Sequence, residues 1–352
     1  MKEISADLLR IIDANINRMG EGLRVLEEFA RLSLNDSVIT QQLKNMRHRL
    51  VNTGADLQNQ LLGARDSEGD VGSVMNVPGE VKTREAAEAV IANARRVQES
   101  LRVMEEISKA PGISLDSEEY RKARFELYTI EKELLARMSR QDKIKRLTGL
   151  YVVIDTEWLK GRHPEDIVRQ AIRGGAKVIQ LRCKERSTRE FLAIAGDLKK
   201  ICADNGILFI VNDSLEVALA SGADGLHVGQ DDLPVKTARK LIPIDMILGS
   251  SVSTVDEART ALAEGADYLG VGAIYATATK ESAAAVGPGR LKEIKKAVNL
   301  PVVAIGGINK GNISAVMKAG ADAAAVISAV MDAENVEKAV RQLVDIIEGA
   351  IN

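Results

Sequence analysis

The chain has 352 residues, more than one hydrophobic core usually serves, so its length favours two domains. Hydrophobic residues make up 45% of it and charged residues 28%, which is typical of a folded globular protein and excludes a disordered chain. A formal net charge of −2 argues against a general nucleic-acid or membrane surface, and 2 cysteines are too few for a disulfide framework or a cysteine-type zinc site.

The first residues, MKEISADLLRIIDAN, are charged and indicate a helix rather than the apolar region of a secretion signal. No apolar run in the chain approaches the roughly 20 residues that a membrane span needs. These features predict a cytoplasmic protein that acts on small molecules and contacts neither membrane nor nucleic acid.

Helical periodicity dominates the chain up to about residue 140. The segment ANINRMGEGLRVLEE begins at Ala14, and the related segment ANARRVQESLRVMEE begins at Ala92, 78 residues later. A weaker match follows in the next helices, where Arg47 corresponds to Arg124. A duplicated helix pair predicts a four-helix bundle with pseudo-twofold symmetry.

Both copies of the repeat place their apolar residues on one helix face and their charged residues opposite. Such a charged face is usually solvated, but its repetition is also compatible with a shared site or with a face that forms a homo-oligomer. The polar segment 64–72 between the copies fits either a plain connection or a substrate-contacting loop.

These features resemble the ThiD2 family over nearly all of residues 5–138. The resemblance is carried by the two repeated helices, by Arg47-His48-Arg49 and by the segment from Arg65-Asp66 to Gly72. It implies that a helical domain in residues 1–143 phosphorylates hydroxymethylpyrimidine phosphate to the diphosphate, with ATP as the expected donor. The segment has neither a Walker A loop nor a kinase-type glycine-rich loop, so a non-catalytic dimerisation module is the alternative.

A basic segment, 140–146, is the predicted linker, and short β-branched runs alternate with helical stretches beyond it. These runs lie at 150–154, 178–181, 207–211, 225–228, 246–249, 268–271, 302–305 and 324–327. Their spacing predicts an α/β domain in residues 148–352, a (β/α)8 TIM barrel. A Gly-Ala pair before every second run predicts left-handed helix caps there. An open doubly wound sheet is the alternative, but no GxGxxG follows the first run.

Charged residues follow several of these strands, at the end where such barrels carry their chemistry. Arg182 and Lys184 end one strand and Lys280 follows another, and these three cations suit a diphosphate. Asp213 and Asp232 are suited to Mg²⁺, which takes one or two carboxylates together with waters and substrate phosphates.

A second anion subsite is predicted after the last two strands. Gly306-Gly307 and Ser328 offer backbone N–H groups to a singly charged phosphate there. Two phosphate subsites, one bridged by Mg²⁺, suit displacement of pyrophosphate by a phosphorylated nucleophile. His227 is better interpreted as a packed, hydrogen-bonded strand residue than as a catalyst.

Residues 148–348 resemble the thiamine-phosphate synthase family. The resemblance is carried by QLRCK at 180–184, by VNDSLEVALASGADGLHVGQDDL from Val211, by AIYATATK ending at Lys280, and by AIGGIN and ISA near the end. Two departures are visible, Cys183 where Glu is frequent and Ala276 where Pro is frequent. Neither position carries a chemical role.

The resemblance implies a role for each matching position. It places the pyrimidine diphosphate against Arg182, Lys184, Asn212, Ser251 and Lys280, with Gln180 near the pyrimidine ring. It places the thiazole phosphate against Thr277, Thr279, Gly307, Ile327 and Ser328, and Mg²⁺ on Asp213 and Asp232. The predicted catalytic residues are Lys280, Arg182 and Ser251.

The expected reaction joins hydroxymethylpyrimidine diphosphate to hydroxyethylthiazole phosphate, giving thiamine phosphate and pyrophosphate. Stabilising charge on the departing pyrophosphate is the main task of such a site, and the attacking ring nitrogen needs no general base. A thiazole tautomerase is one alternative for the barrel, and a phosphate-binding protein without turnover is another.

Overall fold

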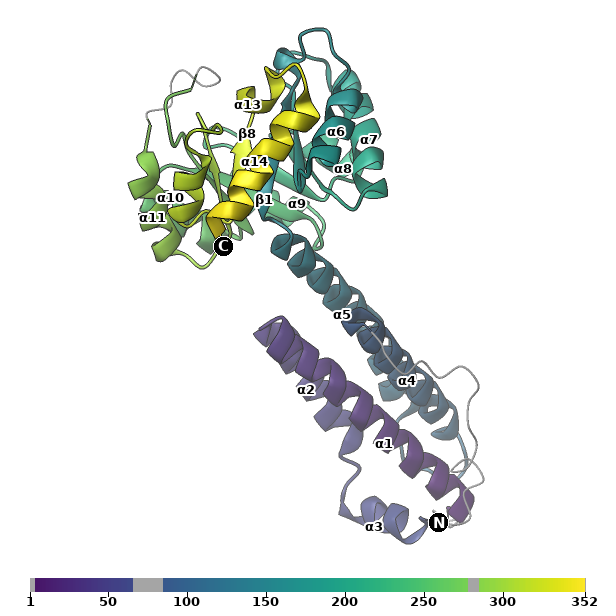
Figure 1. Cartoon of the computed structure of the whole chain (residues 1–352). Coiled ribbons are helices and arrows are strands. Elements are labelled where there is room, and N and C mark those ends of the chain that lie inside the picture. Colours follow the sequence, from purple (N-terminus) through teal and green to yellow (C-terminus); the bar gives the residue numbers. More distant parts are fainter. Residues whose placement is uncertain (1–3, 66–84, 278–284, 352) are drawn as a thin grey trace. The chain divides into compact units, whose positions relative to one another are not determined.

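The structure is a computed structural model that describes residues 4–65, 85–277 and 285–351. Internal contacts divide the chain into two compact units, Met1–Ser139 and Arg140–Asn352 (Figure 1). The first is all-helical and the second is a closed eight-stranded barrel, which confirms the predicted fold class. In the described part of the chain, no helix combines the length and the apolar character that crossing a membrane requires.

The helical unit contains the two predicted helix pairs. Its elements are α1 (Ala6–Glu28), the short π-helix η1 (Phe29–Ser33), α2 (Ser37–Val51), α3 (Ala55–Gly63), α4 (Ala86–Ile107) and α5 (Ser117–Lys145). Side chains cap the first two long helices, because Ser5 accepts from the Leu8 amide and Asp36 from those of Val38 and Ile39. Helices α1 and α2 form one pair, α4 and α5 the other.

Corresponding charged residues of the repeat hold each pair together. Arg47 of α2 donates from Nε and Nη2 to Oε2 of Glu27, both at 3.0 Å, and Arg124 of α5 donates from Nη2 to Oε2 of Glu105 at 2.9 Å. Both glutamates are buried, with 4% and 5% of their surface exposed. Breaking a buried pair is costly, so these repeated charges have a structural role in both copies.

Helices α1 and α4 approach each other closely. A Cβ on Gly22 of α1 would lie 2.5 Å from Cγ2 of Val97 and 3.2 Å from the Asn93 carbonyl oxygen. Only glycine fits there, which explains this residue in the first copy of the repeat. The apolar faces of the four long helices form one core, which includes Ile12, Leu23, Leu101 and Leu127.

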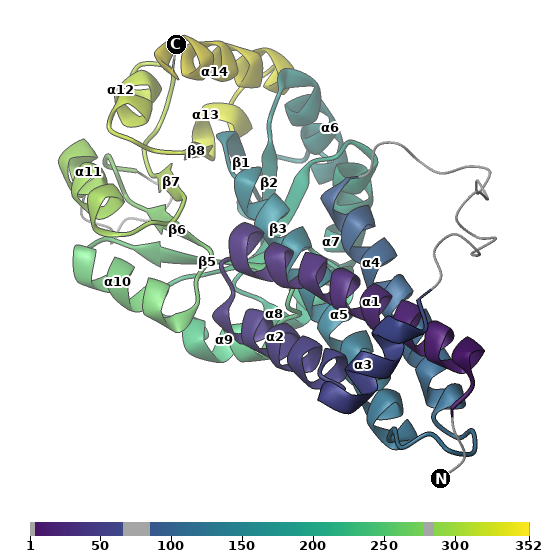
Figure 2. The same cartoon turned by 90° about the horizontal axis from the view of Figure 1, so that it is seen from below.

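Eight parallel strands close the barrel in chain order, from β1 to β8 (Figure 2). They are β1 (Gly149–Asp155), β2 (Val178–Arg182), β3 (Leu208–Asn212), β4 (Gly225–Val228), β5 (Ile247–Val252), β6 (Tyr268–Val271), β7 (Val302–Ile305) and β8 (Ala323–Val326). Each predicted run overlaps one of them. The ends differ by up to three residues, most at β5, which continues to Val252.

Helices surround the strands on the outside. They are η3 (Thr156–Trp158), α6 (Pro164–Gly174), α7 (Thr188–Asp204), α8 (Leu215–Ser221), α9 (Val235–Leu241), α10 (Val255–Glu264), α11 (Gly287–Ala297), α12 (Ile313–Lys318), α13 (Ser328–Met331) and α14 (Val336–Ile351). The predicted glycine caps are confirmed: Gly175, Gly222 and Gly265 have φ values of 104°, 65° and 99°, and Gly320 one of 101°.

Two large side chains fill the barrel interior below the site. Tyr151 of β1 and Tyr268 of β6 are 2% and 1% exposed. They fit because strand glycines make room: a Cβ on Gly249 would lie 2.1 Å from Cζ of Tyr268. The predicted linker is helical, because α5 extends through it to Lys145. Its side chains contact the barrel, where Lys143 Nζ donates to the Asp245 carbonyl at 2.9 Å.

Candidate functional site

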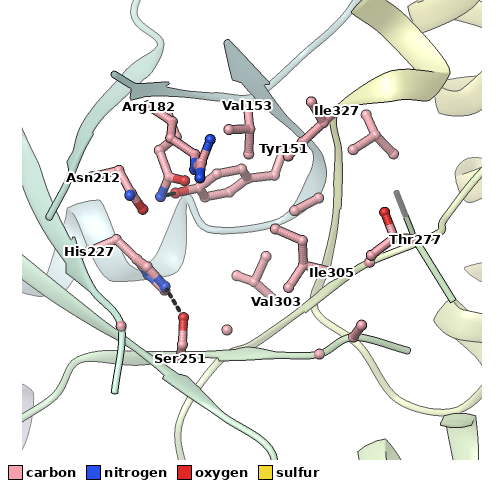
Figure 3. Close-up of a pocket in the computed structure, with 18 of the residues that line it drawn as sticks. Tyr151, Val153, Arg182, Asn212, His227, Ser251, Thr277, Val303, Ile305 and Ile327 are labelled. Atoms are coloured by element: carbon pink, nitrogen blue, oxygen red, sulfur yellow. Dashed lines mark hydrogen bonds between the residues drawn. The ribbon is translucent and has the colours of Figure 1, made fainter. Parts of the chain in front are cut away.

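A pocket of about 270 Å³ opens at the carboxyl ends of the strands. Figure 3 shows Arg182, Asn212 and His227 on one side of it and Thr277, Ile305 and Ile327 on the other. The predicted residues that line it are Gln180, Arg182, Lys184, Asn212, Asp213, Asp232, Ser251, Thr277, Gly306, Gly307, Ile327 and Ser328. The structure therefore brings them together. Thr279 and Lys280 lie outside the described residues.

Arg182 is held by a carboxylate that sequence reasoning missed. The last residue of β1, Asp155, is fully buried, and its Oδ2 accepts from Nη1 of Arg182 at 2.5 Å. Strands β1 and β2 pair in register with these two residues side by side. A charged hydrogen bond to this buried carboxylate fixes the half-buried guanidinium at the pocket wall, where it can meet an anion.

Lys184 and the two predicted metal ligands form a second cluster. Lys184 Nζ lies 2.5 Å from Oδ2 of Asp213. Burial and the neighbouring Asp232 carboxyl raise the pKa of Asp213 to about 6, while Lys184 opposes that rise. Asp232 is fixed from its own loop, since the Gly229 amide donates to its Oδ2 at 2.8 Å. The carboxyl groups of Asp213 and Asp232 thus lie next to each other in a partly buried site.

Asp213 also has an unusual backbone. Its φ of 64° is in the left-handed region, which aspartate tolerates better than most residues. Its amide donates to the His227 carbonyl at 2.8 Å, which ties this turn to β4. The turn directs the carboxylate toward Lys184 and Asp232, so the conformation serves the site.

Ser251 ends a chain of hydrogen bonds that crosses the barrel interior. His227 Nε2 lies 2.9 Å from Ser251 Oγ, and its Nδ1 lies 3.0 Å from the Tyr268 hydroxyl (Figure 3 shows the first contact). The Tyr268 and Tyr151 hydroxyls are 3.2 Å apart, and Gln180 Nε2 donates to the latter at 2.9 Å. Burial lowers the pKa of His227 to about 4, so the imidazole is neutral at pH 7.

The opposite side of the pocket is built from backbone. Gly306 and Gly307 follow β7 with φ values of 101° and 63°, and Cβ atoms there would lie 2.6 Å from backbone atoms of the loop after β6. Ile327 was predicted as a strand residue, but β8 ends before it, and Ser328 opens α13 directly afterwards. Backbone N–H groups and the Ser328 hydroxyl thus border this side.

The fit of the site to a divalent cation can be judged from its donors. Asp213 and Asp232 supply two hard oxygen ligands in one place, and the raised pKa of Asp213 reflects the cost of two adjacent negative charges. Within the described ranges, no group of three or more His, Cys, Asp or Glu side chains is arranged to hold a metal ion. Such a pair fits Mg²⁺, which leaves most of its coordination to water and phosphate.

Sequence reasoning missed three residues that position the predicted ones. Asp155 follows a buried strand as Asp213 does, so position alone was an available signal. Tyr151 and Tyr268 begin or lie within apolar runs, and nothing in the sequence distinguishes their hydroxyls from packing groups. Only the closed barrel brings them within hydrogen-bond distance, 117 residues apart in the chain.

Both units of the chain match known protein families. Residues 150–330 match the family described as Thiamine monophosphate synthase, and residues 10–133 match the ThiD2 family. The chain is 38% identical to the thiamine-phosphate synthase of Thermosynechococcus vestitus, covering 96% of this chain and 94% of that one. It is also 38% identical to that of Gloeobacter violaceus, with 93% of each chain covered.

A solved structure resembles the barrel. The thiamine phosphate pyrophosphorylase from Pyrococcus furiosus is 42% identical and superposes with a TM-score of 0.55, covering 59% of this chain and 98% of that one. The two thiamine-phosphate synthases named above, by contrast, align over nearly the full length of both chains. The chain therefore belongs to the thiamine-phosphate synthase family.

Proposed function

We propose that the barrel joins hydroxymethylpyrimidine diphosphate to hydroxyethylthiazole phosphate, forming thiamine phosphate and pyrophosphate. The observation that carries this proposal is the division of one pocket into two unlike sides. Arg182, Lys184 and the carboxylate pair line it from the ends of β2, β3 and β4, whereas Gly306-Gly307 and Ser328 line it from the ends of β7 and β8. The first group of residues suits a diphosphate, and the second suits a phosphate monoester.

This arrangement supports a substitution at the pyrimidine methylene carbon. The bond between the pyrimidine methylene carbon and the diphosphate oxygen breaks, and its electron pair leaves with pyrophosphate. The lone pair of the thiazole nitrogen then forms the new C–N bond, without loss of a proton. Arg182 and Lys184, with Lys280, stabilise the negative charge that develops on the leaving group.

Asp213 and Asp232 would hold Mg²⁺, which when bound adds positive charge at the leaving diphosphate. Gln180 is fixed by Tyr151 in a position to meet the pyrimidine ring, and Ser251 is fixed by neutral His227. The apolar side chains of Val303 and Ile305 exclude water beneath the reacting atoms.

The test supplies ready-made pyrimidine diphosphate, thiazole phosphate and Mg²⁺, and measures both thiamine phosphate and pyrophosphate. Lys280→Ala should reduce kcat by more than about 100-fold. His227→Ala should cost less, about 10-fold, because His227 acts only through Ser251. Equal inactivation by the two substitutions would refute these roles, and turnover without pyrophosphate would favour a tautomerase.

We further infer that the helical unit phosphorylates hydroxymethylpyrimidine phosphate and so supplies the barrel's diphosphate. The support is the match of residues 10–133 to the ThiD2 family and the persistence of this unit in the full-length relatives. Residues 66–72, which the sequence comparison singled out, lie outside the described residues.

One incubation tests both activities. The full chain receives hydroxymethylpyrimidine phosphate, thiazole phosphate and Mg²⁺, with and without ATP. We expect thiamine phosphate only when ATP is present. Product that forms solely from ready-made diphosphate would leave the barrel assignment intact and reduce the helical unit to a structural or dimerising role.

A further inference from the structure

The two helix pairs of the helical unit differ in spacing. Backbones of α1 and α2 run within 8 Å of each other over much of their length, whereas those of α4 and α5 hardly do so. Gly20 permits the close pair, since a Cβ there would lie 3.3 Å from Cγ2 of Val51. In the second copy Gln98 takes this position, and its Nε2 donates to Oε2 of Glu131 at 2.6 Å. A long side chain thus replaces close packing.

The wider spacing leaves an open recess of about 230 Å³ between α4 and α5. It is lined by Arg95, Gln98, Glu99, Arg102, Arg124 and Tyr128, that is, by three guanidinium groups and one carboxylate. Arg102 and Arg124 are paired with Glu105, each at 2.9 Å. Arg95 is exposed and has no hydrogen bond or ion pair with any described residue. The recess therefore carries one cation ready to meet an anion.

An aromatic surface adjoins these cations. Phe125 and Tyr128 are 54% and 41% exposed and meet edge to face, with ring centroids 5.8 Å apart. The Arg124 guanidinium lies 5.0 Å from the Phe125 ring centroid, and its Nη1 donates to the Tyr128 hydroxyl at 3.3 Å. Two exposed rings beside arginines are suited to stack a planar ligand.

The first copy of the repeat lacks this chemistry. It keeps the structural pair of Arg47 and Glu27, which corresponds to Arg124 and Glu105. The counterparts of Arg95, Phe125 and Tyr128, however, are Asn17, His48 and Val51. Maintaining the bundle therefore does not require Arg95 or the rings, because the same ion pair forms without them.

We propose that this recess binds a phosphate ester of a planar heteroaromatic ring. Arg95 binds the phosphate, and Tyr128 stacks on the ring. Arg102 and Arg124 stay paired with glutamates of α4 and add positive charge beside the phosphate. Glu99 accepts a hydrogen bond from a donor group on that ring. The volume of about 230 Å³ is below the roughly 300–1,000 Å³ of sites for drug-sized ligands, so it suits one ring with one phosphate.

Two sources share this chemistry, the pyrimidine phosphate and the nucleotide donor. The claim that the occupant is a substrate rests on the phosphorylation proposed above. The claim that it binds in the recess does not. Binding is therefore measured without turnover, by calorimetric titration of the full chain with hydroxymethylpyrimidine phosphate alone, with ADP alone and with inorganic phosphate alone.

The variants compare residues inside and beside the recess. Arg95→Gln should weaken the ester that binds there by about 10-fold, and Tyr128→Ser by a similar factor. Arg96→Gln removes the adjacent exposed arginine of α4, which does not line the recess, and should change affinity less than about 2-fold. The barrel's sites are the same in all variants, so only differences between variants report on the recess.

Each outcome has a definite meaning. Selective weakening of either the pyrimidine ester or ADP by both recess variants supports the proposal and identifies the source. Equal effects of Arg95→Gln and Arg96→Gln, or unchanged binding in Tyr128→Ser, would overturn it. If the recess variants bind normally and the chain still forms product with ATP, the recess proposal alone is refuted. If binding is selective but no ATP-dependent product forms, the kinase assignment alone is refuted.

Discussion

At the scale of single residues, Asp155 is the carboxylate on which the position of Arg182 depends. It is fully buried and 2.5 Å from the guanidinium. Asp155→Asn removes the charge and keeps the size, so Arg182 should lose its fixed direction. We expect KM for the pyrimidine diphosphate to rise about 10-fold, or about 1.4 kcal/mol, with kcat reduced less than 3-fold.

Steady-state kinetics with thiazole phosphate in excess measures this split. Arg182→Lys serves as the comparison, because it keeps a cation but loses the planar fork. A fall in kcat alone for Asp155→Asn would contradict a positioning role.

His227 gives a prediction on pH and stability. Burial lowers its pKa to about 4, below the unfolded value of about 6.5. Below pH 6.5 the unfolded chain binds this proton and the folded chain does not, so the stability contributed is present above that pH and is lost as pH falls toward 4. Between pH 7 and pH 5 the loss should be about 2 kcal/mol.

Urea unfolding of the wild type and of His227→Gln at both pH values checks this. The variant cannot titrate at this position, so its stability should fall less between pH 7 and pH 5, by that same difference. Parallel losses in the two proteins would show that His227 is protonated as readily in the fold as outside it.

Much of the site could be predicted from the sequence because its residues sit at strand ends. Arg182 and Asn212 are the last residues of their strands, and Ser251 is the last but one of its strand. The face to which each side chain points follows from the alternation of side chains along a strand. The hydrogen-bonded chain beneath them could not be predicted. Its register depends on how strands far apart in sequence close the barrel, and no local pattern encodes that.

At the scale of elements, the barrel repeats a pair of strands. Three even-numbered strands are preceded by Gly-Ala-Asp, and in each the aspartate accepts from an amide of the preceding strand. Asp224 accepts from Phe209, Asp267 from Leu248 and Asp322 from Val302, at 3.0, 2.9 and 2.6 Å. The glycine cap was predictable from the repeat, but the role of the carboxylate was not, because its partner lies on another element.

A cation from the helix that precedes the odd-numbered strand completes each unit. Lys199 of α7, Arg239 of α9 and Lys295 of α11 lie 2.8, 2.9 and 2.5 Å from these aspartates. The strand pair β1–β2 departs from the pattern, with the exposed Lys177 in the aspartate's place. Three of the four pairs therefore share one stabilising device.

This device predicts an unequal response to substitution. Asp267→Ala should destabilise the barrel by about 3 kcal/mol, because it removes the carboxylate that accepts from Nη1 of Arg239 and from the buried Leu248 amide. Lys177→Ala at the corresponding position should cost less than about 0.5 kcal/mol. Urea unfolding followed by circular dichroism measures both, and similar costs would show that the shared pattern is incidental.

At the scale of the whole molecule, the two units have separate cores. Leu23 and its neighbours pack in the helical unit, while Leu147 packs with Tyr151 and Tyr268 at the base of the barrel interior. The boundary between the units falls within helix α5, between Ser139 and Arg140. From Arg140 onward the side chains of this helix contact the barrel, as in the pair of Arg140 with Asp267 at 3.7 Å. Composition and repeats could predict two units, but not this attachment, since basic segments are more often solvated.

Separate cores predict two unfolding transitions for one chain. Leu23→Ala should lower the free energy of unfolding of the helical unit alone, and Leu147→Ala that of the barrel alone. Each loss should be about 3 kcal/mol, because both side chains are fully buried. Differential scanning calorimetry of the full chain resolves the transitions, and synthesis of thiamine phosphate from ready-made diphosphate identifies the barrel's. That activity should survive up to the barrel transition in Leu23→Ala and be lost at lower temperature in Leu147→Ala. A single transition that both substitutions lower equally would mean that α5 couples the two cores into one cooperative unit.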